Sequence, residues 1–309
     1  MSSLLVFPGQ GAQQPGMLQR LAQSPQARAC LQEASDVLGQ DALTLDSPQA
    51  LASTRAVQLC LLIAGVAAAR TLLQPDTRVN YVAGLSIGAY PAAVVAGALE
   101  FADALRLVSL RGELMQQAYP QGYGMTALIG LELAAVEGLL AQVHSPQRPV
   151  YLANINADNQ VVIAGSDAAM HAVAELARGG GVAKRLAVSV PSHCPLLEQP
   201  AQALAAAFAE VPLQLPKLGY LSGSRARLMR SVEALRDDLA FNMCRVVDWR
   251  GTVQSAYERG VRLQIELPPG AVLTGLARRV FAQGTVIAFD GARLDTLQAL
   301  LSEEGSRDR

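Results

Sequence analysis

The sequence is poor in the residues that usually mark nucleic-acid binding, metal sites or disulfide-stabilised scaffolds. Of its 309 residues only 17% are charged, the formal net charge is −1, and 5% are aromatic. A charge so nearly balanced gives no general attraction for nucleic acid. The cysteines stand far apart, without the paired spacing of a zinc site or a disulfide framework. They are Cys30, Cys60, Cys194 and Cys244. We therefore expect no metal and no nucleic-acid partner.

Long hydrophobic runs are also missing. The longest, Leu59 to Ala69, is shorter than the roughly 20 residues that a helix needs to span a bilayer, so it is typical of a buried helix. No basic segment precedes the apolar residues at the N-terminus, as a secretory signal would require. We expect a cytoplasmic protein with no membrane partner. The length and the apolar content of 51% allow one large α/β domain or two unequal ones.

Histidine is scarce, and this narrows the choice of a general base. The chain holds His144, His171 and His193. The first lies in a polar segment and the second on an amphipathic helix, so we expect both at the surface. His193 stands between Pro191 and Pro195, which restrict the backbone around it. It is the best candidate for a base, although a lone histidine after a strand is often structural. We expect the neighbouring Cys194 to be a small buried residue.

The stretch Tyr81–Tyr90 contains the pattern Gly-x-Ser-x-Gly, with Ser86 at its centre. It follows a short apolar segment and precedes an alanine-rich helical run, which is the layout of a nucleophile elbow. Glycines at 84 and 88 would let a strand and a helix approach closely in so tight a turn. A helix that begins after the serine directs free N–H groups, such as that of Ile87, at an oxyanion. An ordinary glycine-rich turn has the same local pattern.

A second glycine-rich loop follows the first expected strand, Leu4–Phe7. Such a loop lies at the carboxyl edge of a sheet, where α/β sites are found. It is not a P-loop, because the Gly-Lys-Ser/Thr ending is missing. The Gln10 N–H is therefore a candidate for the second donor of an oxyanion hole, with the Ile87 N–H as the first. A plain turn is the alternative.

The order of elements predicts an α/β protein with an inserted subdomain. Residues 1–124 and 190–309 alternate between helical and strand patterns, which favours a large domain with a parallel sheet. Residues 125–189 instead read β-α-β-β-α-β, the ferredoxin-like pattern. In that segment Asp167 is expected to cap a helix. On the helix expected at 101–117, Arg111 continues an apolar face, although spacing alone favours a solvated arginine.

Taken together, these segments resemble the malonyl-CoA:acyl carrier protein transacylase family. The resemblance rests on motifs that occur in the same order over nearly the whole chain. They are Phe7–Gly11, Gly84–Gly88, Leu110–Gly112, Gln160–Gly165, Val190–His193 and Gly270–Leu276. The resemblance implies an α/β-hydrolase-like domain, a ferredoxin-like subdomain and an active site in the groove between them.

The resemblance also implies a role for each candidate residue. Ser86 would be the nucleophile, His193 the base, and the N–H groups of Gln10 and Ile87 the oxyanion hole. Arg111 would bind the free carboxylate of the malonyl group. A backbone carbonyl from near 239–242 would orient the histidine. No cofactor would be bound; malonyl-CoA would be the substrate, and the phosphopantetheine-type arm of an acyl carrier protein would be the acceptor.

Two positions depart from the usual pattern of fatty-acid transacylases, Gly-His-Ser-x-Gly-Glu. Leu85 stands in place of the histidine and Ala89 in place of the glutamate. The form Gly-Leu-Ser-Ile-Gly-Ala is similar to the transacylase (epsilon) subunit of bacterial malonate decarboxylase. We therefore expect the malonate decarboxylase carrier subunit as acceptor, with other subunits of that enzyme as further partners. The alternative is a transacylase of fatty-acid or polyketide synthesis.

Two other classes of protein share part of the pattern. A serine esterase or thioesterase would need a triad acid, for which Asp103, Asp158 and Asp167 are the candidates between Ser86 and His193. A non-catalytic carrier-binding scaffold is the second rival. Carrier proteins are typically acidic, so a set of basic residues is expected to bind the carrier. The alternative is that these residues belong to a solvated charged loop with no docking role. The basic residues are Lys184, Arg185, Arg225, Arg227 and Arg230.

Overall fold

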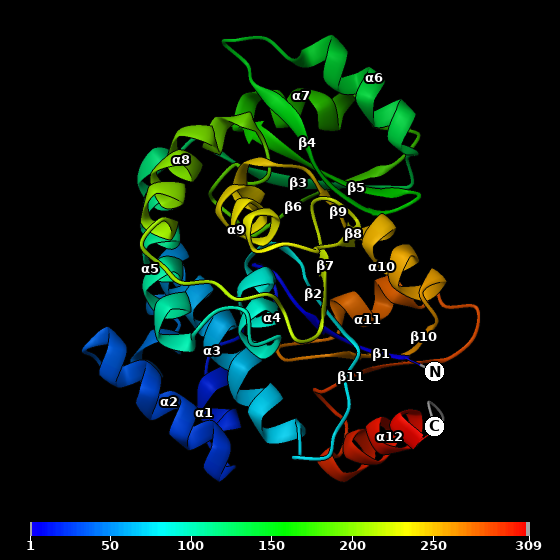
Figure 1. Cartoon of the computed structure of the whole chain (residues 1–309). Helices are drawn as coiled ribbons and strands as arrows, with labels where there is room; N and C mark the ends of the chain where they lie inside the picture. Colours follow the sequence, from blue (N-terminus) through cyan, green and yellow to red (C-terminus); the bar gives the residue numbers. More distant parts are fainter. Residues whose placement is uncertain (1, 307–309) are drawn as a thin grey trace.

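The computed structural model describes residues 2–306 and contains a six-stranded and a five-stranded sheet (Figure 1). The larger sheet has the strand order β11-β10-β1-β2-β7-β8, with all neighbours parallel except the antiparallel pair β7–β8. Its strands are β1 (Ser2–Phe7), β2 (Tyr81–Gly84), β7 (Gly219–Ser222), β8 (Arg227–Leu228), β10 (Val261–Glu266) and β11 (Thr285–Ala288). The predicted parallel sheet of the large domain is confirmed.

Helices cover both faces of this sheet, as alternation along β1 requires. Leu5 and Phe7 join the large core under α3, while Leu4 and Val6 join a smaller core under α10 and α11. The helices of the large domain are α1 (Met17–Leu21), α2 (Pro25–Leu38), α3 (Thr54–Leu72), α4 (Ala89–Val95), α5 (Phe101–Ala118), α8 (Glu198–Phe208), α9 (Val232–Phe241), α10 (Trp249–Glu258), α11 (Val272–Ala277) and α12 (Leu294–Ser306). Five short 3-10 turns join them: η1 (Ala42–Asp46), η2 (Ala50–Ala52), η3 (Ser86–Gly88), η4 (Pro195–Leu197) and η5 (Asn242–Cys244).

Helix α3 is the central helix of the large core. The Ser53 side chain accepts a hydrogen bond from the Ala56 N–H and so caps its N-terminus. By length and composition this helix could cross a membrane, but 83% of its most apolar window is buried inside the protein. Burial on nearly every side explains its apolar sequence, as expected for a core helix.

The smaller sheet confirms the predicted order β-α-β-β-α-β. Its strands lie in the order β6-β3-β5-β4, antiparallel throughout, with α6 and α7 packed on one face (Figure 1). The elements are β3 (Tyr123–Ile129), α6 (Leu133–Val143), β4 (Val150–Ala157), β5 (Gln160–Ser166), α7 (Asp167–Leu176) and β6 (Val182–Arg185). One detail differs: Ser166, not Asp167, caps α7, because the serine hydroxyl accepts the Ala169 N–H.

The fifth strand of the smaller sheet comes from the large domain and so connects the two parts of the chain. Strand β9 (Val247–Asp248) comes from the C-terminal half and pairs in parallel with β4, with Asn154 opposite Val247. Its next residue, Trp249, is fully buried and begins α10, which belongs to the smaller core of the large sheet. Two residues of pairing give a sequence pattern too short to predict. This strand carries the chain from the His193 side of the site back to the large sheet.

Candidate active site

The predicted elbow is a tight connection between β2 and η3. The Leu85 N–H donates to the Phe7 carbonyl at 3.0 Å, and Ser86 has a φ of 57°. A Cβ on Gly84 would lie 2.0 Å from the Gly88 carbonyl carbon, and a Cβ on Gly88 would lie 2.2 Å from the Phe7 oxygen. Only glycine fits at either position. The two glycines therefore hold Ser86 where strand and helix nearly touch.

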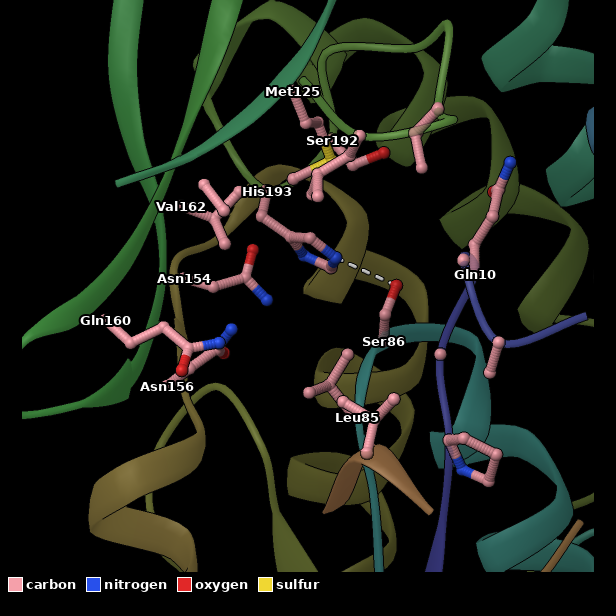
Figure 2. Close-up of a pocket in the computed structure, with 18 of the residues that line it drawn as sticks. Gln10, Leu85, Ser86, Met125, Asn154, Asn156, Gln160, Val162, Ser192 and His193 are labelled. Carbon is pink, nitrogen blue, oxygen red and sulfur yellow. Dashed lines mark hydrogen bonds between the residues drawn. The ribbon is translucent and has the colours of Figure 1, made fainter. Parts of the chain in front are cut away.

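Ser86 and His193 lie within hydrogen-bonding distance although 107 residues separate them. The distance between Ser86 Oγ and His193 Nε2 is 2.8 Å, drawn as the dashed line in Figure 2. The other ring nitrogen, Nδ1, lies 2.7 Å from the carbonyl oxygen of Asn242. His193 has a φ of 65°, and among the described residues only Ala226 joins these two as a non-glycine with positive φ. Strained backbone of this kind is concentrated at functional sites.

The environment of His193 keeps its ring neutral. Burial, and after it the positive charge of Arg111, lowers the pKa of His193 to about 4. A neutral ring carries one proton, and a carbonyl oxygen can only accept, so Nδ1–H donates to Asn242. Nε2 then offers its lone pair to the Ser86 hydroxyl. This is the arrangement that a general base requires.

Arg111 is fully buried beside this pair, contrary to what its spacing alone suggests. Its Nη1 donates to Gln58 Oε1 at 2.7 Å and its Nη2 to Asn242 Oδ1 at 3.1 Å. Its Nε has no hydrogen-bond partner, and no carboxylate of residues 2–306 pairs with the guanidinium. Arg111 does not line the pocket next to Ser86; it reaches the dyad through Asn242. The site thus contains a buried cation without an anionic partner.

The two candidate oxyanion donors lie next to the serine. Gln10 lines the same pocket as Ser86, and Figure 2 shows it on the side of Ser86 opposite Asn154. The Gln10 N–H is absent from the loop and turn hydrogen bonds of the described chain. Ile87 is fully buried and follows the serine at the start of the short helical segment. Both placements suit the predicted role.

A pocket of about 520 Å³ extends from Ser86 between the two sheets. One wall is formed by the 8–12 loop, Leu85 and α11 of the large domain. The opposite wall is the open face of the small sheet. Three of its residues carry amide side chains, labelled in Figure 2: Asn154, Asn156 and Gln160. Lys184 and Arg185 on β6 line the pocket and are exposed.

Each of the three aspartates considered as a triad acid forms a salt bridge with an arginine. Asp103 pairs with Arg106 at 2.9 Å, Asp158 with Arg250 at 2.6 Å and Asp167 with Arg185 at 2.7 Å. None of them reaches His193, whose Nδ1 is held by a carbonyl. An esterase of the Ser-His-Asp type is therefore not supported by the described residues.

Neither a thiol nucleophile nor a metal centre fits this site. Burial raises the pKa of the Cys194 thiol to about 12, and its Sγ donates to the Pro191 carbonyl at 3.2 Å. Within the described chain no cluster of three or more histidine, cysteine, aspartate or glutamate side chains could hold a metal ion. Ser86 and His193 are the groups that the geometry brings together for chemistry.

Several residues of the site were not singled out from the sequence. Asn242 supplies both the carbonyl for His193 and the amide for Arg111, and it falls within the 239–242 segment named above. Gln58 is fully buried in the apolar helix α3, and its polarity there was the available signal. Asn154 and Asn156 lie two residues apart on β4 and both line the pocket; the burial pattern of this strand, whose pairing with β5 shifts register twice, gave no clear alternation that could have singled them out.

The chain was compared with known proteins of similar sequence. It is 39% identical over 286 residues to a malonyl CoA-acyl carrier protein transacylase of Haemophilus influenzae, covering 89% of this chain and 91% of the relative. It is equally identical, over 289 residues, to the transacylase of the same name in Escherichia coli strain K12, with the same coverage of each chain.

Solved structures give the same result. The crystal structure of FabD from Acinetobacter baumannii superposes with a TM-score of 0.92 at 38% identity, covering 98% of this chain and 99% of that one. A malonyl-transacylase in complex with its type II PKS acyl-carrier protein superposes with a TM-score of 0.90 at 35% identity, covering 98% and 100%. The acyl transferase domain family matches residues 4–299. The chain therefore belongs to the acyl transferase domain family.

Proposed function

We propose that the protein is a malonyl-CoA:acyl carrier protein S-malonyltransferase. The observation that carries the proposal is the Ser86–His193 pair, oriented by a carbonyl and set beside a buried arginine that no carboxylate neutralises. An acyl donor with a free carboxylate would supply the missing charge. Three of the relatives compared above are named malonyl transacylases, and these names support the same substrate.

The geometry supports a two-step transfer. Ser86 Oγ attacks the thioester carbonyl carbon while His193 Nε2 takes the hydroxyl proton. The N–H groups of Gln10 and Ile87 stabilise the oxyanion. The carbon–sulfur bond then breaks, and His193 returns the proton to the departing CoA thiolate. The carrier thiol reverses these steps: it gives its proton to His193, attacks the acyl-serine carbonyl, and Ser86 recovers the proton.

Arg111 is proposed to select malonyl over acetyl groups. Its guanidinium is held by Gln58 and Asn242, and its unpartnered Nε leaves one donor without an acceptor. Because it does not line the pocket, the malonyl carboxylate must pass Ser86 to reach it. An arginine suits this task because its planar fork can contact both carboxylate oxygens.

We further propose the malonate decarboxylase carrier subunit as the acceptor. The basis is the pair Leu85 and Ala89: Leu85 lines the pocket, and Ala89 is 3% exposed at the start of α4. Replacing a polar pair by two apolar residues leaves neither partner unsatisfied, so the elbow keeps its packing while the pocket wall becomes apolar. A carrier of fatty-acid or polyketide synthesis is the alternative acceptor, and it is the one that the names of the relatives favour.

The basic residues considered for carrier docking differ in how free they are. Arg225 is bound to Asp237, and Arg185 pairs with Asp167 and donates to the Tyr123 carbonyl at 2.8 Å. Lys184, Arg227 and Arg230 are exposed. We propose that Lys184, which lines the pocket, contributes most to the attraction of an acidic carrier protein. We also propose that the reaction takes place in the cytoplasm. Lys184→Glu should then raise the KM for the carrier more than Arg230→Glu does, in a salt-dependent way.

The test is a labelling and chase experiment. Radiolabelled malonyl-CoA should label the wild type and leave Ser86→Ala unlabelled; an unlabelled wild type would remove the transferase proposal. The labelled enzyme is then offered carriers armed either with phosphopantetheine or with phosphoribosyl-dephospho-CoA. Transfer mainly to the second supports the malonate decarboxylase assignment, and transfer mainly to the first replaces it with fatty-acid or polyketide synthesis. Malonate release faster than either transfer would indicate a hydrolase.

A further inference from the structure

Glu266 is a buried acid that the proposed reaction does not use. It is the last residue of β10, its side chain is fully buried, and of residues 2–306 no lysine, arginine or histidine pairs with it. Its oxygens instead accept two backbone N–H groups: Oε1 accepts that of Leu273 at 3.0 Å and Oε2 that of Thr274 at 2.6 Å. Burial raises the pKa of Glu266, and these two N–H groups act in the opposite direction. A carboxylate is costly to bury, so its contacts call for an explanation.

The backbone of Glu266 is held firmly in the large sheet. Glu266 lies between β1 and β11, opposite Val6 on one side and Ala288 on the other. Its carbonyl accepts the Phe289 N–H at 2.8 Å, and the N–H of the next residue, Leu267, donates to the Val6 carbonyl at 2.8 Å. The side chain of Glu266 therefore projects from a fixed point of the sheet, and whatever it binds is fixed with it.

The segment that Glu266 binds is the start of α11, which forms part of the pocket wall. The first N–H groups of a helix have no partner within the helix, and Glu266 supplies an acceptor for two of them. Leu273 and Leu276 of α11 line the pocket and are only 1% and 6% exposed. They belong to the smaller core of the large sheet, against which Leu85 packs. Contacts thus run from Glu266 through α11 to the residue that precedes Ser86.

Three adjacent parallel strands of the large sheet end at this wall. Strand β1 leads into the 8–12 loop, β2 leads into Ser86, and β10 leads into α11. The first two strand ends carry the Gln10 N–H and the nucleophile. The chain turns into η3 directly after β2, whereas residues 267–271 separate β10 from α11. In that turn the Gly270 N–H donates to the exposed Asp290 at 2.7 Å, so the buried anchor of α11 is Glu266.

Water competes with the carrier thiol in the proposed reaction. Once Ser86 is acylated, a water oxygen can attack the acyl carbonyl carbon while His193 Nε2 takes a proton from that water. The bond between the carbonyl carbon and Ser86 Oγ then breaks, Ser86 Oγ recovers the proton, and malonate leaves. The same base activates a thiol and a water, so the dyad does not distinguish them. Exclusion of water by the walls of the site does.

We infer that Glu266 is a positioning residue that protects the acyl-serine from hydrolysis. This inference rests on the proposed function. By holding the start of α11, Glu266 keeps Leu273 and Leu276 packed beside Leu85, which closes that side of the site to water. When the anchor is weakened, α11 opens more often, and hydrolysis from the open state rises in proportion to its population. Discharge to a thiol, which enters through the pocket, changes little.

The test compares two fates of malonyl-Ser86 in the same protein. The enzyme is loaded with malonyl-CoA and freed of CoA, and loss of the malonyl group is followed by intact-protein mass, with and without pantetheine. In Glu266→Gln the amide oxygen can accept one N–H, but the N–H₂ cannot accept the other. The ratio of hydrolysis to transfer should rise about two- to tenfold, the range of one hydrogen bond, and further in Glu266→Ala. Only acylated molecules are counted, so a misfolded fraction does not change the ratio.

Asp46→Asn is the matched control. Asp46 is also fully buried, and its Oδ2 accepts the Leu18 N–H at 2.8 Å in the first turn of α1. It does not line the pocket. Its substitution should lower the free energy of unfolding but leave the ratio of hydrolysis to transfer unchanged. An equal rise in Asp46→Asn would mean that any loosening of the fold admits water, and would refute a specific role for Glu266.

Two measurements remain decisive if the Glu266 variants do not fold. Hydrogen exchange of the wild type should show slow exchange of the Leu273 and Thr274 amides, and fast exchange would refute the anchoring. Leu276→Ala opens the same wall and leaves Glu266 in place, so it should also raise the ratio. Leu297→Ala, which removes an equally buried side chain from the large core, should not.

The outcomes separate this inference from the proposed function. If malonyl-Ser86 forms and passes to pantetheine, but Glu266→Gln and Leu276→Ala keep the wild-type ratio, the protective role is refuted and the transferase proposal stands. A wild type that loses malonate to water as fast as it transfers malonyl to pantetheine also refutes protection. If malonyl-CoA does not acylate Ser86, the proposed function fails and this inference fails with it.

Discussion

The buried charge of Arg111 leads to a prediction that distinguishes two roles for this residue. If the guanidinium binds the malonyl carboxylate, Arg111→Met removes a contact that only malonyl donors make. If it merely holds Asn242 in place, the same substitution disturbs the His193 carbonyl partner and slows every acyl donor equally. The ratio of kcat/KM for malonyl-CoA to that for acetyl-CoA separates the two roles.

The expected magnitude follows from the contacts. A charge-assisted hydrogen bond is worth about 1.5–3 kcal/mol, and each 1.36 kcal/mol is a factor of ten. The Arg111→Met enzyme should therefore lose about 10- to 150-fold of its preference for malonyl over acetyl. Since Nε is already without a partner, a carboxylate can gain this donor without breaking an existing hydrogen bond. Arg111→Lys should recover little, because a point charge lacks the planar fork.

The assay is acyl-Ser86 formation from each donor, with Arg106→Met as the control. Arg106 lies on the same helix α5 but is exposed and paired with Asp103, so its removal should leave the ratio unchanged. Equal slowing of both donors in Arg111→Met would refute a carboxylate-binding role. Arg111 would then be a positioning residue that acts through Asn242.

Three other predictions test the dyad, the buried carboxylate of Asp238 on helix α9 and the elbow. The pKa of His193 is about 4 in the folded protein and 6.5 in the unfolded chain, so the unfolded chain takes up the proton first as the pH falls. The free energy of unfolding should therefore decrease by up to about 3 kcal/mol between pH 6.5 and pH 4. The His193→Gln variant should lose less over the same range. Asp238 accepts from Ser222, Ser224 and Tyr220, so Asp238→Ala should cost about 3 kcal/mol in urea unfolding, against almost nothing for exposed Asp76→Ala. Gly84→Ala should lower the free energy of unfolding by more than about 4 kcal/mol in the same assay. The control is Gly138→Ala on helix α6, where the new Cβ meets nothing within 4 Å; it should raise the free energy of unfolding by about 0.5–1 kcal/mol. Similar values for the two variants would contradict the steric account.

The sequence was most informative where the chemistry depends on adjacent residues. The elbow could be predicted because its glycines, its serine and the following helix lie within one short stretch, and the structure gives the steric reason. The ferredoxin-like order could be predicted because its strands alternate and its helices are separated by clear turns. Element ends shifted by a few residues, as expected when caps such as Ser166 decide them.

Features built from distant segments were harder to predict. Spacing alone placed Arg111 at the surface, because nothing in its own helix reveals that Gln58 and Asn242 enclose it. The carbonyl partner of His193 is 49 residues away, and a backbone carbonyl leaves no trace in a side-chain pattern. Strand β9 has two residues, fewer than any periodicity can detect. Such features became accessible only through resemblance or through the three-dimensional structure.

A last prediction follows from the charges that surround His193. Its pKa is held low by burial first and by Arg111 second, so His193 is a neutral base beside a cation that no carboxylate of the described residues neutralises. A malonyl group on Ser86 whose carboxylate pairs with Arg111 would cancel the second influence but not the first. The pKa of His193 should then be higher in the malonyl-enzyme than in an acetyl-enzyme, which has no carboxylate. Since the proton must be absent for the carrier thiol to be activated, the rate of deacylation should fall at a higher pH for malonyl-Ser86 than for acetyl-Ser86. Deacylation by pantetheine, followed from pH 3.5 to 7.5 for both acyl-enzymes, measures this difference. Superimposable pH profiles would show that the bound carboxylate does not neutralise Arg111, whatever the rates themselves are.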